Sequence, residues 1–557
     1  MLLALAGVTI MASGTALAQT PPTSLPGSAD PARIKPIELP TAPAINTGIN
    51  LPQVVPSMPI PKGASAIRFK LDHVKLDGVT AFAPAELSDI YAPYIGKEIS
   101  LDVAYTVASL ITERYRNAGY FLSLAYVPNQ SIKGGTVTIR VVEGRIDKVA
   151  LDNTAVDSWI IQDYIAQLTS YKPVTSKAVE SFLLRLNDIP GYTFRAVLSS
   201  ADKGSEGAMK LTLTPEKQAG RGALVFDNYS SRFLGPHQAS VTYSTSFLPG
   251  HQTTISGLNS LPFSKLHYAN LSHSFVVAPR VSVELHGGMT KAEPGYTLKP
   301  FEVKSTSKTI GATVNYQLIR QRQENLGIKL GFDARNSTSD LLSAPLSRDR
   351  IRTLKAGVNY DMADRWDGYN YFTFNVTQGL SALGSSKKGQ LNLSRSEAKP
   401  DFTKAEASIS RLQALTDNWS LQVNASGQIA SGPLYSSEEF GYGGQSFGRA
   451  YDESEIVGDH GIAASAEIRY GGWRDVTDIA TLQPYAFIDS GRVWNDDANQ
   501  AYMQTATSTG MGVRFATEWD QSGNLGVAFP IHRDIASPVY GMGEDGPRIL
   551  LRISQGF

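Results

Sequence analysis

The segment WSLQVNAS at residues 419–426 alternates apolar and polar side chains one by one. Successive side chains of a β-strand point to opposite faces, so this alternation predicts a strand with one apolar and one polar face. The pattern recurs in VSVELH at 281–286, LKAGVNYD at 354–361 and FTFNVT at 372–377. From Arg221 onward, strand-like segments of about 9–14 residues alternate with turn-rich gaps, and no helical periodicity is visible.

Three features favour a membrane barrel over a soluble β-domain with the same alternation. The segments are long enough to cross a bilayer when tilted, and Tyr and Trp recur near their ends, where interfacial girdles lie. The chain also ends in a strand whose apolar face is Ile549, Leu551, Ile553 and the terminal Phe557. The sequence therefore predicts a mainly β protein, with an antiparallel transmembrane barrel of about sixteen strands over residues 219–557.

Composition excludes several classes of protein. The 557 residues contain 51 Lys and Arg, 51 Asp and Glu, and no Cys. Balanced charge argues against nucleic-acid binding, and the lack of cysteine excludes disulfides and thiolate metal sites. His267 and His273 share one strand face, but no carboxylate pair completes a metal site, so we expect no metal and no cofactor.

The N-terminal region divides into a signal and a spacer. Residues 1–18 carry no charge and end in an A-x-A cleavage pattern at Ala16–Ala18, which predicts a signal peptide; a membrane anchor is the alternative. Residues 19–65 are rich in proline, which fixes φ and cannot donate a backbone hydrogen bond. We expect this stretch to be an extended, disordered linker, with a docking segment as the alternative.

Two small mixed units are predicted between the linker and the barrel. Residues 66–146 suggest the order strand, helix, helix, strand, strand, beginning at Ile67–Leu71, with the longer helix at 102–117. Residues 147–217 repeat this order, so the two units are an internal repeat. A short sheet with an open edge can accept a further strand from another chain, although both units could also be mere spacers.

Four short motifs give the chain a resemblance to a known family. They are VVEGRI at 141–146, FGRAY at 447–451, GDHG at 458–461 and FIDSG at 487–491. With them, nearly the whole mature chain resembles the two-partner secretion transporters of the haemolysin-activation and filamentous-haemagglutinin-secretion type. The resemblance implies a signal peptide, two POTRA (polypeptide-transport-associated) domains in the periplasm and a sixteen-stranded barrel in the bacterial outer membrane.

The resemblance also implies a site inside the barrel. The family carries Val-Arg-Gly-Tyr/Phe in a loop between strands 11 and 12 that folds into the lumen, and here Gly448, Arg449, Ala450 and Tyr451 stand at these positions. Gly448 and Ala450 depart from the family residues. The family pattern F-x-D-x-G of strand 13 is matched by residues 487–491, at Phe487, Asp489 and Gly491.

The implied interaction is an ion pair between Arg449 and Asp489 that positions the loop as a plug or guide. An Arg fork suits two-point contact with a carboxylate. Without the family match, a solvated loop charge is the simpler interpretation of Arg449. Family members often begin with a plug helix, which the prolines of residues 21–61 disfavour, so any plug here is short or non-helical.

The implied function is export of an unfolded secreted client, of haemolysin or adhesin type, through the lumen. Client contacts are expected on a POTRA sheet edge and in the adjoining helix groove, at Leu122, Leu124, Tyr126 and the helix 102–117. Phe557 is expected to be the C-terminal signal for the barrel-assembly machinery, and the other implied partner is outer-membrane lipid. No nucleic acid is expected to bind.

Two rival functions remain: a barrel-assembly factor, and a passive porin or an enzyme of the outer membrane. A porin would not need two periplasmic domains. A barrel-assembly or insertase factor shares POTRA domains, loop motif and barrel, although such proteins usually carry more POTRA units. An outer-membrane enzyme would need a nucleophile with a base. The sequence GQSFG at 444–448 spells G-x-S-x-G, but it lies in a glycine-rich loop rather than between a strand and a helix, so we expect no catalytic residue.

Overall fold

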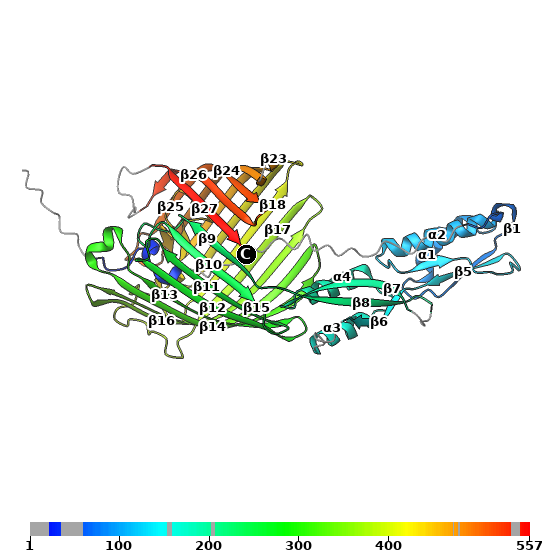
Figure 1. Cartoon of the computed structure of the whole chain (residues 1–557), viewed down its shortest axis with the longest axis horizontal. Coiled ribbons are helices and arrows are strands. Elements are labelled where there is room, and N and C mark those ends of the chain that lie inside the picture. The colour runs from blue at the N-terminus through cyan, green and yellow to red at the C-terminus, as the bar shows by residue number, and fades with distance from the viewer. Residues whose placement is uncertain are drawn as a thin grey trace, which may run out of the picture.

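The computed structural model describes residues 22–34, 60–152, 159–201, 206–471, 473–476, 479–535 and 546–557. A wide barrel forms one end of the molecule, and two small α+β units extend in a row from one rim of the barrel (Figure 1). The predicted signal peptide, residues 1–18, lies outside the described residues.

The barrel is closed and antiparallel throughout. Among the described residues it contains seventeen strand segments, but β22 and β23 both pair with β24 in continuing order, so they are two pieces of one strand and the barrel has sixteen. The predicted fold class is thus confirmed. The segments are β9 (Arg221–Asp227), β10 (Gln238–Thr245), β11 (His251–Ser260), β12 (Leu266–Ala278), β13 (Val281–Ala292), β14 (Lys304–Arg320), β15 (Glu324–Leu341), β16 (Ala344–Ala363), β17 (Gly368–Gly379), β18 (Thr403–Ala414), β19 (Trp419–Ala430), β22 (His460–Tyr470), β23 (Trp473–Val476), β24 (Ile479–Trp494), β25 (Met503–Thr517), β26 (Gln521–Asp534) and β27 (Arg548–Gly556).

The first and last strands close the barrel. β27 pairs with β9, and the terminal residue continues the ladder, because Gly222 N–H donates to Phe557 O at 2.7 Å. The Phe557 ring is exposed on the outer wall and stacks on Tyr243, with 6.3 Å between ring centroids. Closure leaves no strand edge, which is what a lipid environment requires of a β protein.

The two faces of the wall differ as the alternation predicts. Large apolar side chains are exposed on the outside, including Ile310 at 67% and Leu330 at 59%. Polar side chains such as Thr242, Gln428 and Ser508 are buried on the inside. An apolar exterior around a polar interior is the pattern of an outer-membrane barrel. None of the helices in the described ranges is long and apolar enough to cross a membrane.

Both α+β units have the same topology. The first contains β2 (His73–Asp77), α1 (Pro84–Tyr91), α2 (Leu101–Asn117), β4 (Leu124–Tyr126) and β5 (Thr136–Val142); the second contains β6 (Arg145–Leu151), α3 (Trp159–Thr169), α4 (Ser176–Asn187), β7 (Tyr192–Ser200) and β8 (Ala208–Lys217). In each, the first strand runs parallel to the last, and the last is the middle strand of three. The predicted internal repeat is confirmed.

The prediction of the first strand was wrong in one respect. Residues Ile67–Leu71 do not enter the three-stranded sheet; their extended part, β1 (Arg68–Lys70), pairs with β3 (Glu98–Ser100) in a separate two-stranded ribbon. The sheet strand is β2, a few residues later. Both stretches alternate, so periodicity alone could not tell which one pairs with β5.

The motif at 141–146 forms the joint between the two units. The Glu143 carboxylate accepts hydrogen bonds from the backbone N–H groups of Thr80 at 2.7 Å and Ala81 at 2.8 Å, and from the Tyr115 hydroxyl at 2.7 Å. A Cβ on Gly144 would lie 2.3 Å from Leu122 Cβ, so only glycine fits where the chain passes into the second unit.

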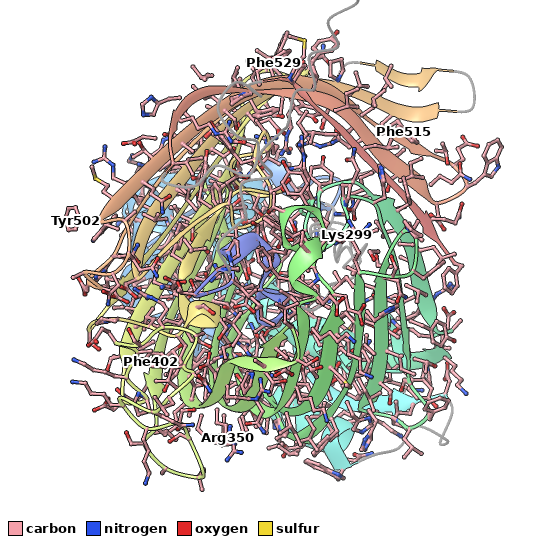
Figure 2. The ribbon with its side chains drawn as sticks, turned by 90° about the vertical axis from the view of Figure 1, so that its left-hand side faces the viewer. Lys299, Arg350, Phe402, Tyr502, Phe515 and Phe529 are labelled. Atoms are coloured by element: carbon pink, nitrogen blue, oxygen red, sulfur yellow. The ribbon has the colours of Figure 1, made fainter. Side chains whose placement is uncertain are left out.

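Residues 22–34 of the predicted disordered linker are ordered, and its residues 19–21 and 35–59 lie outside the described residues. Residues 22–34 form two short 3-10 turns, Gly27–Ala29 and Pro31–Arg33, which lie inside the ring of strands (Figure 2). The Asp30 side chain accepts from Ala32 N–H at 2.9 Å, and Pro31 opens the second turn, where its missing N–H costs nothing. Ala29 is fully buried against Phe233 and loop residues of the β13–β14 connection. Proline excluded a long helix here but not a packed turn.

Candidate functional site

The loop at residues 431–459 folds back into the barrel. It connects β19 and β22, the eleventh and twelfth strands counted from β9, which is the interval that the family resemblance implies. Within it, β20 (Phe440–Tyr442) and β21 (Ile456–Gly458) pair as a short hairpin. The tip motif at 448–451 is buried at Gly448, Arg449, Ala450 and Tyr451. This segment is called the luminal loop below.

Arg449 and Asp489 are in direct contact, as the resemblance implies. Arg449 Nε donates to Asp489 Oδ2 at 2.9 Å and Nη2 donates to Oδ1 at 2.8 Å, so the guanidinium grips both carboxylate oxygens. The backbone N–H of Arg449 adds a third bond to Oδ2 at 3.1 Å. Arg449 is 7% exposed and Asp489 is 0% exposed. Two-point, charge-assisted contacts of this kind fix orientation as well as distance.

Three residues of the F-x-D-x-G pattern share the inner face of β24 and play three different parts. The Phe487 ring lies under the arginine, with Arg449 Cζ 3.4 Å from the ring centroid. Asp489 accepts the fork. Gly491 leaves room for Tyr442, because a Cβ there would lie 2.1 Å from Tyr442 Cδ2. Spacing by two puts all three on one side of a strand.

A second carboxylate in this network was not foreseen. Glu467 of β22 binds Arg449 Nη1 through Oε2, and its Oε1 accepts from Arg469 at 2.7 Å and lies 2.7 Å from Arg514 Nη1. Glu467 is 3% exposed. The signal was available in the sequence, because ionisable residues on a strand of a membrane barrel are costly unless they face the lumen in pairs.

The tip of the loop is anchored to the wall by Tyr451 and Arg548. Tyr451 N–H donates to Gly448 O at 2.8 Å and closes a turn, with Gly448 in the left-handed region at φ 73°. The Tyr451 hydroxyl lies 2.7 Å from His532 O and 3.0 Å from Thr507 O. Arg548 donates to Tyr451 O and to backbone carbonyls beside β9. The glycine that departs from the family residue therefore occupies a conformation that suits glycine.

The foot of the loop has its own arginine, which the sequence analysis did not single out. Arg395, from the β17–β18 loop, grips both oxygens of Asp459 and lies 3.0 Å from Glu439 Oε1. Asp459 also accepts backbone N–H bonds from Leu434 at 2.8 Å and Asp496 at 3.0 Å. The GDHG motif thus supplies the acceptor that ties three loops together.

The N-terminal turns contact the same loop. Ser436 Oγ donates to Asp30 Oδ2 at 2.7 Å, and Arg33 donates to the carbonyls of Ser436 and Glu439, the second at 3.0 Å. Ser231, in the β9–β10 loop, donates a hydrogen bond from its Oγ to Ser28 O. Residues 22–34 therefore pack against the luminal loop inside the barrel.

The three residues expected to bind a client lie differently. Leu124 and Tyr126 are half-buried on β4, an edge strand whose one partner among the described residues is β5. The Tyr126 hydroxyl donates to Glu206 of the second unit at 2.8 Å. Leu122 is only 8% exposed and packs into the core of the second unit with Ile146, so that residue is not available at the sheet edge. The expectation that Leu122 contacts a client at the sheet edge is therefore corrected.

The enzyme-like and metal-like patterns resolve into ordinary structure. Ser446 of the G-x-S-x-G pattern is exposed in an irregular stretch, and the pattern is followed by a turn rather than a helix. His273 lies 3.2 Å from His251 across the β11–β12 pair. Within the described residues, no group of three or more His, Asp or Glu side chains could hold a metal ion.

Comparison with known proteins agrees with this architecture. The model of the family described as "Haemolysin secretion/activation protein ShlB/FhaC/HecB" matches residues 207–515, and that of "POTRA domain, ShlB-type" matches residues 69–144. The Heme/hemopexin transporter protein HuxB of Haemophilus influenzae is 25% identical over 468 residues, 81% of each chain. The Outer membrane transporter CdiB of Dickeya dadantii is 21% identical over 478 residues, 83% of each chain.

Solved structures share the fold. CdiB from Escherichia coli superposes with a TM-score of 0.70 at 18% identity, covering 96% of this chain and 94% of that chain. BamA from Haemophilus ducreyi lacking POTRA domains 1–3 gives a TM-score of 0.53 at 12% identity, covering 88% of this chain and 100% of that chain.

Fold and luminal loop define a POTRA-bearing outer-membrane transporter, with its α+β units in the periplasm. The family match covers more than half of the chain, and the protein belongs to the haemolysin secretion/activation family. Members of this family are transporters of secreted proteins. The predicted resemblance, fold class, location and general function are thus confirmed.

Proposed function

We propose that this transporter captures one unfolded exoprotein, of haemolysin or adhesin type, on its first POTRA unit and passes it through a lumen that the luminal loop closes at rest. Residues 66–146 and 147–217 are the capture units and residues 219–557 the channel. The observation that carries the proposal is the loop held across the lumen by a buried Arg449 with two carboxylates. HuxB and CdiB carry the names of a haem/hemopexin transporter and an outer membrane transporter.

Capture is proposed at β4. Within the part of the chain that the structure describes, this strand pairs with β5 on one side only, so its other edge can hydrogen-bond an extended client segment. Leu124 and Tyr126 lie on it and are half-buried. Backbone pairing supplies affinity without a strict sequence requirement, which suits a client that must slide onward.

Opening requires the Arg449 network to be replaced rather than merely broken. Removing one partner of a buried ion pair costs about 3–5 kcal/mol, because the other charge stays behind without compensation. A client segment that enters the lumen can supply polar contacts in exchange. The N-terminal turns must leave with the loop, since Asp30 and Arg33 are bonded to it.

The energy for transport is proposed to come from the client. The sequence contains no Walker-type phosphate loop. Folding of the emerging chain outside the cell removes the unfolded species and so prevents its return. In this proposal the protein is not an enzyme, and Ser446 is an ordinary loop residue.

The test is the composition of the culture medium. In the source bacterium, the gene is replaced by one that encodes a protein lacking residues 66–217. The control is the same strain with the full-length gene restored. Secreted proteins and outer-membrane proteins are then quantified by mass spectrometry. We expect one large secreted protein to disappear from the medium while other barrels keep their amounts. Loss of other barrels would instead indicate an assembly factor, and an unchanged medium would contradict export.

A further inference from the structure

A cavity of about 710 Å³ lies between the second POTRA unit and the barrel. Residues of α3 and α4 line one side, and the near ends of β13 to β17 line the other. Two contacts fix this junction: Arg320 at the end of β14 binds Asp188 through two hydrogen bonds of 2.6 and 2.7 Å, and Gly250 N–H donates to Pro190 O at 3.0 Å. The cavity is therefore a built feature of the entrance.

The cavity is on the inside of the wall. Its lining residues Asn359 and Asp361 alternate along β16 with Val358 and Tyr360, which belong to the same face as the exposed Leu354. Successive strand residues face opposite sides. Lipid outside the barrel therefore does not reach the cavity, whereas a polypeptide passing from the POTRA units into the lumen does.

Arg185 of α4 is a buried cation in this cavity without an ion-pair partner among the described residues; the charge of Asp188 acts on it, but Asp188 is bound by Arg320. It is 9% exposed, and it has no hydrogen bond or ion pair to any residue that the structure describes. Its Nε is both buried and unpartnered. Burial, and then the nearby charge of Arg280, lower the pKa of the Arg185 guanidinium. A buried charge without a partner is unfavourable, and an anion would relieve it.

Arg280 supplies a second positive charge. It stands at the tight β12–β13 turn with φ 67°, an uncommon conformation for a residue other than glycine. Its backbone N–H donates to the Tyr164 hydroxyl at 3.0 Å, and its Nη2 reaches Gln167 Oε1 only at 3.5 Å. No described carboxylate forms an ion pair with it.

The carboxylates that line the cavity are already engaged. Asp188 is held by Arg320. Asp361 accepts from Asn325 at 2.9 Å and from the Tyr369 hydroxyl at 2.8 Å. The lining thus carries three guanidinium groups, of Arg185, Arg280 and Arg320, against the two carboxylates of Asp188 and Asp361, so a net positive charge faces whatever enters the lumen.

We propose that Arg185 and Arg280 form a carboxylate-binding subsite for Asp and Glu side chains of the polypeptide in transit. The inference rests on the proposed export function and adds a chemical preference to the entrance. Guanidinium groups bind carboxylates in a two-point geometry. A subsite of one or two such contacts holds each acidic residue briefly and releases it, as passage requires.

The test uses the full-length protein in detergent and two fluorescein-labelled, unstructured Gly-Ser peptides that differ only in carrying Glu or Gln at regular positions. Fluorescence anisotropy measures binding to the unchanged chain, to Arg185→Gln, to Arg280→Gln and to Arg185→Lys. The matched control is Arg195→Gln, because Arg195 lies in the same unit with its side chain 75% exposed and does not line the cavity.

We expect the Glu peptide to bind about tenfold more tightly than the Gln peptide, and Arg185→Gln to remove most of that preference. Arg280→Gln should weaken it in the same direction. Arg185→Lys keeps the positive charge and should retain part of the preference for the Glu peptide. This variant separates loss of the site from loss of folding. Arg195→Gln should leave it unchanged.

Equal binding of the two peptides, or equal effects of Arg185→Gln and Arg195→Gln, would overturn the inference. Displacement of the Glu peptide by inorganic phosphate at cellular concentration would also overturn it, since the site would then belong to small anions. The assay involves no transport, so its outcome is independent of the secretion experiment above. Failure of secretion with intact peptide preference would count against the export proposal alone.

Discussion

Tyr442 of the luminal loop packs onto the backbone of β24 at Gly491, where a Cβ would lie only 2.1 Å from the Tyr442 ring. Tyr442 is fully buried, and its ring centroid lies 6.2 Å from that of Tyr451 at the loop tip. Asp489, two residues before Gly491 on the same strand, binds Arg449 of the loop. β24 thus positions the luminal loop in two ways: the Asp489 carboxylate binds Arg449, and Gly491 leaves space for the Tyr442 ring.

Gly491→Ala should displace the luminal loop without removing any charge. The added methyl group overlaps the Tyr442 ring, and over-packing of this kind costs about 1–3 kcal/mol. Planar-bilayer recordings should show a larger conductance or more frequent opening, and the thermal unfolding temperature should fall.

The matched control for Gly491 is Gly287→Ala on β13. A Cβ at Gly287 would meet only Thr309 O, at an ordinary 3.8 Å. We expect normal conductance from this control. Equal behaviour of the two variants would show that the contact between Tyr442 and Gly491 does not hold the loop.

Arg395→Gln should free the foot of the luminal loop. Asp459 is fully buried and would lose its two-point partner, at a cost of about 3–5 kcal/mol. Protease cleavage within residues 431–459 should become faster. Lys388→Gln is the control, because Lys388 is exposed in the same β17–β18 loop. If the Arg395 variant resists protease as well as the control does, Arg395 does not hold the foot of the luminal loop.

Residues 22–34 should have to leave the lumen before a client passes. The chain has no cysteine, so cysteines placed at the contacting residues Ser28 and Ser231 can be joined by oxidation to a disulfide without competing thiols. We expect the joined protein to be inactive in secretion and low in conductance. Each single-cysteine variant, treated in the same way, should be active. Full secretion by the joined protein would mean that the turns do not obstruct the path.

The joint at Glu143 should weaken in acid. Burial raises the pKa of this carboxyl, but hydrogen bonds from Thr80, Ala81 and Tyr115 outweigh burial, and the net pKa is lowered. A lowered folded-state pKa gives stability that is present above the unfolded value, about 4.3, and is lost as pH falls through the folded value.

Glu143→Gln should therefore be less stable at neutral pH, by about 1.5 kcal/mol because the carboxylate is partly solvated, and should lose the acid dependence below about pH 4.3. Hydrogen exchange of α2 in the full-length protein, corrected for the intrinsic pH dependence of exchange, measures both effects. An acid response in the variant equal to that of the unchanged chain would assign it to another group.

The wall of the barrel could be predicted because its determinant is local. A period of two, set by the pleat of each strand, marks the apolar face directly, as residues 419–426 show. The repeated order of the POTRA units followed from helical and strand periods. The error at Ile67–Leu71 arose because two alternating stretches compete for one place in a sheet, and long-range pairing makes that choice.

The luminal site could be predicted only where a motif carried it. Arg449 and Asp489 came from family resemblance. A charged residue on a barrel strand already indicated that Glu467 faces the lumen, but its contact with Arg449, 18 residues away, and that of Arg395 with Asp459, 64 residues away, are encoded by no local pattern. The packing of residues 22–34 was missed for a related reason. Proline content reports on helix formation, but not on whether Ala29 finds an apolar pocket made by distant loops.

The most direct test of the account is a double-mutant cycle on Arg449 and Asp489, read by planar-bilayer conductance. Arg449→Ala and Asp489→Ala should each open the pore strongly, since either leaves a buried partner uncompensated. The double variant should be little worse than either single variant. The exposed pair Arg114 and Asp89 in the first POTRA unit is the control and should show no coupling. Additive effects at Arg449 and Asp489 would contradict the claim that this pair holds the luminal loop in place.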